Sequence, residues 1–100
     1  MMKAANFRTL DLNLLRVFDE VMSERNLTRA ASNLAMTQPA VSNALRRLRD
    51  LLGDELVQRS GYGVLPTPAA LALWPAVREA LSLLRHSLAP GVFDPAGATN

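Results

Sequence analysis

The sequence predicts a mainly α-helical domain that carries one short β-hairpin and continues into a long helix. Three observations support this fold class. Apolar residues recur at helical spacing in three segments between positions 11 and 52. A glycine-rich stretch, Ser60-Gly61-Tyr62-Gly63, then separates two short runs that are typical of hairpin strands. Beyond it, Thr67-Pro68 has the cap-then-proline pattern that starts a helix, and helical spacing resumes.

The first two predicted helices are short and are joined closely. The first begins after Asp11 as its N-cap and ends near Arg25, where Asn26 is expected to stop it because Asn tolerates the left-handed conformation. Thr28 is expected to cap the second helix. Apolar residues in that helix follow at i, i+3, i+4 and i+7, namely Leu27, Ala30, Ala31 and Leu34.

The third predicted helix covers about Gln38–Leu52 and has two different faces. Thr37 is its expected N-cap after an Ala35-Met36 turn, Pro39 falls in its first turn, and Gly53 ends it. One face is apolar and consists of Val41, Leu45, Leu48 and Leu52. The opposite face is polar and consists of Gln38, Ser42, Arg46 and Arg49. A buried stripe with a cationic, hydrogen-bonding outer face suits a helix that enters the major groove of DNA.

The hairpin and the last helix complete the chain. Strands are expected over Glu55 to Arg59 and over Val64 to Leu65, and the last helix runs to about Leu88 before Pro90-Gly91. Apolar residues on this helix are spaced 3, 4, 3, 4, as in a coiled-coil seam: Trp74, Val77, Leu81, Leu84 and Leu88. This stripe predicts a homodimer interface, and the alternative is that it packs on its own domain. Pro75 is expected to kink or overwind the first turns.

The order helix, helix, turn, helix, hairpin is that of a winged helix-turn-helix domain. In that fold the third helix enters the major groove, and the hairpin, or wing, reaches the flanking backbone or minor groove. The sequence therefore predicts three parts: a DNA-binding domain over residues 1–66, a linker and dimerisation helix over 67–89, and a flexible tail over 90–100.

The third helix supplies most of the candidate DNA contacts. Gln38 and Ser42 can pair with base edges, and Asn43 can make a bidentate pair with adenine. Arg46 can reach a guanine edge or a phosphate, whereas phosphate contacts are expected from Arg47 and Arg49. The helix N-termini marked by Thr28 and Thr37 can bind phosphate oxygens.

The wing offers two further candidates, each with an alternative. Arg59 either contacts a phosphate or pairs with Asp54 or Glu55. Tyr62, at the predicted tip, either stacks against the sugar or backbone of the DNA or is an exposed turn residue without a measurable role.

Composition and charge narrow the class of protein. One hundred residues suit a single domain, and the absence of Cys favours a reducing cytoplasm. No apolar run is long enough to span a membrane, and Asp11 and Asn13 interrupt what would be the core of an export signal. The net charge is only +2, yet the stretch from Gln38 to Arg49 holds three Arg and no acid. A local basic face is what phosphate binding requires.

An enzyme is not expected. The single His86 lies near a helix end beside Arg85, and neither a nucleophile–base pair nor a glycine-rich phosphate loop is present. Asp54 and Glu55 are adjacent but lack further ligands for a metal, so no metal or cofactor is predicted. The alternative to DNA binding is a winged-helix module that binds a protein through the same face, although such a face would be richer in exposed aromatics.

The run Leu27–Leu73 resembles the DNA-binding domain of LysR-type transcriptional regulators. The shared motifs are Ala30-Ala31, Thr37-Gln38-Pro39-Ala40-Val41-Ser42, Gly53 to Arg59, and Thr67-Pro68. The resemblance covers about residues 10 to 95. It implies a bacterial, cytoplasmic, nucleoid-associated regulator that binds an interrupted palindrome as a homodimer. A small-molecule inducer would act only through an effector-binding domain that this sequence does not encode.

The resemblance also implies specific DNA contacts. Those on the third helix are Thr37, Gln38, Pro39, Ser42, Asn43 and Arg46, and those on the wing are Arg59, Ser60, Gly61 and Tyr62. Many family members have Arg where this chain has Asn43 and Tyr62, and Phe where it has Val57.

Overall fold

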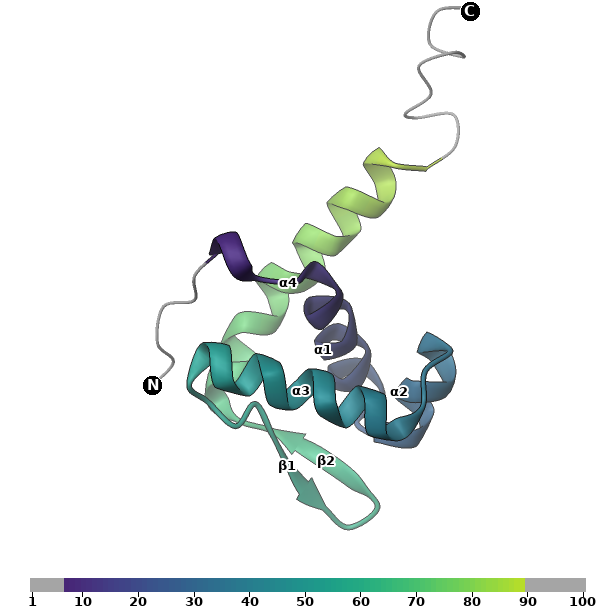
Figure 1. Ribbon diagram of the computed structural model, residues 1–100, viewed down its shortest axis with the longest axis vertical. Helices are drawn as coiled ribbons and strands as arrows, with labels where there is room; N and C mark the ends of the chain where they lie inside the picture. The colour runs from purple at the N-terminus through teal and green to yellow at the C-terminus, as the bar shows by residue number, and fades with distance from the viewer. Residues whose placement is uncertain (1–6, 90–100) are drawn as a thin grey trace, which may run out of the picture.

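The computed structural model describes residues 7–89, which form four α-helices and one antiparallel hairpin (Figure 1). The elements in chain order are a 3₁₀ turn η1 (Phe7–Thr9), α1 (Leu12–Glu24), α2 (Leu27–Leu34), α3 (Gln38–Leu52), β1 (Val57–Ser60), β2 (Gly63–Pro66) and α4 (Pro68–Ser87). The predicted winged helix-turn-helix followed by a long helix is confirmed. The predicted tail over 90–100 lies outside the described residues. Over residues 7–89, no helix is both long and apolar enough to cross a membrane.

The core lies where α1, α2 and α3 meet. Its largest fully buried side chains come from α1, α3 and the segment before the hairpin: Phe18, Met22, Leu48, Leu56, Val17, Val21 and Val41. On α2 the buried residues are Ala30 and Ala31, whose small side chains let its neighbours approach closely. Burying one face of each helix in this way leaves the polar face of α3 on the surface.

The junction between α1 and α2 differs from the prediction. The left-handed residue that ends α1 is Arg25 (φ 57°), not Asn26, and its Nε–H donates to the Met22 carbonyl at 2.9 Å. Asn26 is instead the N-cap of α2, where its side chain accepts from the Arg29 N–H at 2.9 Å. The predicted Thr28 cap is therefore wrong. The left-handed Arg25 ends α1 by itself, so the next residue, Asn26, is already extended (φ −150°) and can cap α2.

The other predicted caps are confirmed. Asp11 accepts from the Asn13 N–H, and Thr37 accepts from the Ala40 N–H at 3.2 Å. Gly53 ends α3 with φ 69°, and Thr67 begins α4. Together these caps give α3 the predicted bounds.

The wing is attached to the corner between α1 and α2. The Val64 N–H donates to the Arg25 carbonyl at 3.0 Å, and Gly63 lies so close that a Cβ there would be 2.4 Å from that oxygen. Ser60 pairs with Gly63 and Val57 with Pro66, so Gly61 and Tyr62 form the tip. The chain enters β1 later than predicted, because Leu56 is left-handed (φ 68°).

Asp54 joins the end of α3 to the start of α4. Its Oδ2 accepts from the Thr67 hydroxyl at 2.7 Å and from the Leu56 N–H at 2.8 Å. These two hydrogen bonds, the Thr67 bond foremost, hold the pKa of Asp54 below its ordinary value of 3.8. The base of the wing thus depends on an ionised carboxylate.

This carboxylate predicts a pH dependence of stability. The contribution of Asp54 is complete above its unfolded pKa and is lost as the pH falls through the lowered folded pKa. We expect Asp54→Asn to reduce the free energy of unfolding by about 1 kcal/mol at pH 7. The difference from the parent should shrink below about pH 4. Urea unfolding between pH 3 and pH 7 measures it, with the exposed Asp50→Asn as control. Parallel pH profiles of Asp54→Asn and the parent would contradict the role of the charge.

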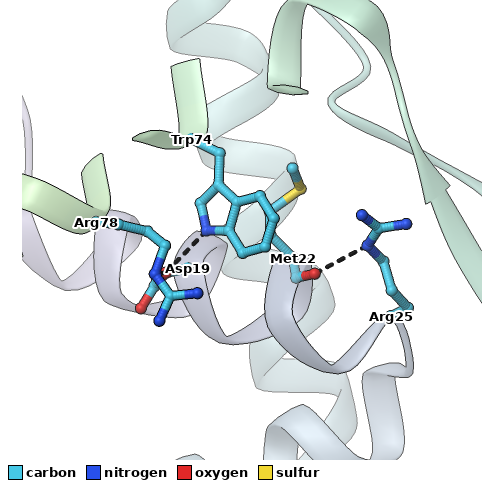
Figure 2. A network of polar contacts seen from close by, with 5 residues as sticks. All are labelled: Asp19, Met22, Arg25, Trp74 and Arg78. Atoms are coloured by element: carbon cyan, nitrogen blue, oxygen red, sulfur yellow. Dashed lines mark hydrogen bonds and ion pairs between the residues drawn. The ribbon is translucent and has the colours of Figure 1, made fainter. Parts of the chain in front are cut away.

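The first half of α4 packs on α1 of the same chain. The Trp74 Nε1–H donates to Asp19 Oδ1 at 2.9 Å, and Arg78 Nε lies 3.6 Å from the same oxygen (Figure 2). The Arg78 guanidinium is also 5.3 Å from the centroid of the Trp74 ring, within the range of a cation–π interaction. Val77 is buried in the core. We call the contact of Asp19, Trp74 and Arg78 the α1–α4 clasp.

The predicted apolar stripe on α4 is therefore divided between two environments. Trp74, Val77 and Leu81 pack against the core of this chain. Because Val77 is buried there, its predicted place in the homodimer interface is wrong. Leu84 and Leu88 are exposed, with exposed fractions of 43% and 68%. α4 runs through Pro75 as one helix, and its C-terminal half projects beyond the other elements (Figure 1).

Candidate nucleic-acid interface

The outer face of α3 carries a line of polar side chains. With 3.6 residues per turn, Gln38, Ser42, Arg46 and Arg49 lie along one side of the helix. Arg46 is exposed, and its Nη2 donates a hydrogen bond to Asn43 Oδ1. Pro39 is also exposed, beside Asn43. This face is open to solvent because the opposite side of α3 is buried in the core.

A groove lies between α3 and the hairpin. We call it the wing groove; its cavity volume is about 490 Å³. Its polar lining comes from Ser42 and Arg49 of α3, from Glu55, and from Gln58 and Arg59 of β1. The wing groove thus brings two arginines from different elements into one hollow.

A smaller hollow lies where the N-termini of α2 and α3 meet the wing. Its cavity volume is about 50 Å³, and its polar lining comes from Asn26, Thr28, Gln38, Arg59 and Tyr62. Free N–H groups at helix N-termini attract anions. The smaller hollow therefore brings together the N-terminus of α2, the N-terminus of α3 and Arg59 of the wing.

The structure brings most of the predicted contact residues together. Thr28, although not a cap, lies in the smaller hollow with Gln38 and Arg59, and Ser42 and Arg49 lie in the wing groove. Tyr62 is fully exposed at the wing tip, with Ser60 and Gly61 beside it. Thr37 is exposed at the start of α3.

Arg47 does not join this surface. It follows Gln38 by nine residues, or about two and a half turns, so it lies on the other side of α3. It lines neither the wing groove nor the smaller hollow.

Of the two alternatives for Arg59, a phosphate contact is favoured over an ion pair with Asp54 or Glu55. Asp54 is occupied by Thr67 and Leu56, and within residues 7–89 no ion pair joins Arg59 to Asp54 or Glu55. Its side chain, exposed and common to both hollows, is thus free to meet an external anion.

Sequence reasoning missed Asn26, Glu55 and Gln58 as members of this surface. Asn26 could have been found, because Asn is among the strongest N-cap residues and precedes an apolar-periodic run. Glu55 and Gln58 carried no such signal. Their place beside α3 depends on how the hairpin folds back.

Comparison with known proteins agrees with this geometry. Residues 12–71 match the family described as "Bacterial regulatory helix-turn-helix protein, lysR family". The chain is 52% identical over 91 residues to the HTH-type transcriptional regulator LeuO of Escherichia coli (strain K12). The matched region covers 91% of this chain and 29% of LeuO. The chain thus spans less than a third of the length of this curated relative. The chain is also 51% identical over 89 residues to nodulation protein D 1 of Rhizobium meliloti (strain 1021); the match covers 89% of this chain and 28% of that protein.

Two solved structures are informative. A probable transcriptional regulator from Pseudomonas aeruginosa has a TM-score of 0.79 at 49% identity, covering 81% of this chain and 27% of that chain. The BenM DBD in complex with catB site 1 DNA has a TM-score of 0.73 at 29% identity, covering 79% of this chain and 85% of that chain. The latter domain was solved bound to DNA.

Proposed function

Since the chain belongs to the lysR family of bacterial regulatory helix-turn-helix proteins, we propose that it binds double-stranded DNA sequence-specifically as the DNA-binding part of a transcriptional regulator. The observation that carries this proposal is the polar face of α3 beside the wing groove. A similar domain, the BenM DBD, forms a complex with DNA. The protein-binding alternative has less support, because Tyr62 is the one fully exposed aromatic side chain among residues 8–89.

In this proposal α3 lies in the major groove. Gln38, Ser42 and Asn43 face base edges, and Arg46 reaches either a base or a phosphate. The backbone phosphates are bound by Arg49, by Arg59 and by the helix ends at Thr28 and Thr37. Residues 1–66 would form this DNA-binding unit, and the site of action would be the nucleoid in the bacterial cytoplasm.

Selection of bound fragments from random duplex DNA tests the proposal. We expect an enriched sequence motif, and we expect the affinity for the selected duplex to fall steeply between 50 and 200 mM salt. A scrambled duplex of the same composition should bind at least about 10³-fold more weakly. No binding to any duplex at low salt would overturn the function. Binding without an enriched motif would overturn its specificity.

We also propose that two copies of the chain form a homodimer through the exposed end of α4, and that this dimer binds an interrupted palindrome. Over residues 82–88 the chain exposes Leu83, Leu84 and Leu88, and no other part of residues 7–89 covers them. A two-fold pair of domains would place two α3 helices on two half-sites. Residues 67–89 would then be the linker and dimerisation helix.

We expect Leu84→Glu to raise the dimer dissociation constant about tenfold or more, because it places an unpaired charge among apolar side chains. Sedimentation equilibrium at micromolar concentration measures it. The control is Leu65→Glu, at a similarly exposed position on the wing (55% exposed). A parent chain that is monomeric at this concentration, or equal masses for the two variants, would count against this interface.

A further inference from the structure

Glu55 is the one acidic residue among those that line the wing groove. It is exposed and lines the wing groove together with Ser42 and Arg49 of α3 and Arg59 of β1. It also lines a neighbouring depression at the C-terminal end of α3 with Arg49 and two further acids, Asp50 and Asp54.

Glu55 has no structural role that explains its side chain. The backbone at this position is engaged, because its carbonyl accepts from the Val57 N–H at 2.7 Å. The carboxylate, in contrast, makes no hydrogen bond or ion pair with any residue that the structure describes. The neighbouring Asp54, not Glu55, holds the base of the wing.

We propose that Glu55 lowers the affinity of this domain for all duplex DNA by repelling the backbone phosphates that enter the wing groove. This inference rests on the proposed function. A DNA strand bound by Arg49 on one side and by Arg59 on the other passes Glu55, which lines the same groove. Like charges a few ångströms apart at a protein surface change a dissociation constant about 3- to 10-fold. The effect is independent of base sequence, because phosphates carry no sequence information.

The position of Glu55 favours phosphate repulsion over base recognition. A carboxylate can accept a hydrogen bond from the cytosine amino group, which would make Glu55 a base-reading residue. Residues that enter the major groove, however, are expected on α3 itself. Glu55 follows Gly53, the residue that ends α3, and lies on the segment that leads into β1.

The test uses a pair of variants with the same change in charge. Glu55→Gln and Glu79→Gln each raise the formal net charge from +2 to +3. Glu79 is exposed on α4 and does not line the wing groove. Binding of each variant and of the parent is measured by fluorescence anisotropy on the selected duplex and on a scrambled duplex. Thermal unfolding of each variant establishes that the fold is intact.

We expect Glu55→Gln to bind both duplexes about 3- to 10-fold more tightly than the parent, and Glu79→Gln to differ by less than about twofold. The ratio between Glu55→Gln and the parent should approach one at high salt, because salt screens exposed charges. Glu55→Lys should bind more tightly still.

Three results would overturn the inference and leave the proposed function standing. In the first, Glu55→Gln and Glu79→Gln have the same effect on a parent that binds DNA. In the second, a folded Glu55→Gln binds more weakly to the selected duplex alone, which would identify Glu55 as a base-reading residue. In the third, the gain in affinity is independent of salt. A parent that binds neither duplex would instead overturn the proposed function.

Discussion

Replacing Gly63 with alanine is expected to destabilise the domain by about 2–3 kcal/mol, a large effect for a single methyl group. The added Cβ would lie 2.4 Å from the Arg25 carbonyl oxygen, which is a backbone atom and cannot move aside like the end of a side chain. The same oxygen accepts the Val64 N–H at 3.0 Å. The wing would have to move away from the corner between α1 and α2, and this hydrogen bond would break.

Gly61→Ala is the matched control. Gly61 has φ 57°, and a Cβ there would meet nothing within 4 Å. Its cost is therefore conformational alone, about 1 kcal/mol. Urea unfolding of the two variants separates close approach from backbone strain. DNA binding should also weaken more in Gly63→Ala, because Arg59 and Tyr62 move with the wing. Equal destabilisation by the two substitutions would contradict the close approach as its cause.

Arg46→Ala is expected to weaken binding to the selected duplex by about 1–3 kcal/mol, or roughly 5- to 150-fold. Arg46 is exposed on the polar face of α3 and is oriented by its hydrogen bond to Asn43. The way in which DNA binding weakens shows whether Arg46 contacts a phosphate or a base. If Arg46 binds a phosphate, the slope of log affinity against log salt falls by about one. If it reads a base, specificity relaxes at one position instead.

The chain offers a control with the same chemistry. Arg16 on α1 donates to Asn13 Oδ1 at 2.8 Å, three residues earlier, as Arg46 does to Asn43 on α3. Arg16→Ala therefore removes the same charge and the same kind of pair away from the proposed interface. Salt titrations of both variants should differ clearly. Equal affinities of Arg46→Ala and Arg16→Ala across the titration would remove Arg46 from the contact surface.

The sequence predicted those features that depend on a few neighbouring residues. Thr37, Pro39 and Gly53 act within one turn of α3, so its bounds could be predicted from local preferences. The junction at Arg25 could not be predicted in this way. A non-glycine residue is left-handed there, and part of what holds it is a β2 residue far along the chain, Val64. Tertiary contact outweighed local preference.

The stripe on α4 shows a different limit. Spacing of apolar residues predicts an apolar face, but not which residues cover it. Trp74 bonds to Asp19, which lies 55 positions earlier in the chain, and no local pattern joins the two. The residues that line the wing groove could not be predicted for the same reason. Glu55 and Arg49 line one groove only when the hairpin folds beside α3.

The α1–α4 clasp has a mechanical consequence. It fixes the first half of α4 to the bundle of α1, α2 and α3, while the far end of α4 projects away (Figure 1). From Val77 to Leu88 the helix extends about 16 Å, so a sideways shift of about 3 Å at Leu88 corresponds to a rotation of about 10°. Because the clasp is at the near end, we infer that this rotation turns α3 as well. α4 is thus a rigid arm on the bundle, and the orientation of its far end and that of α3 are coupled through the clasp.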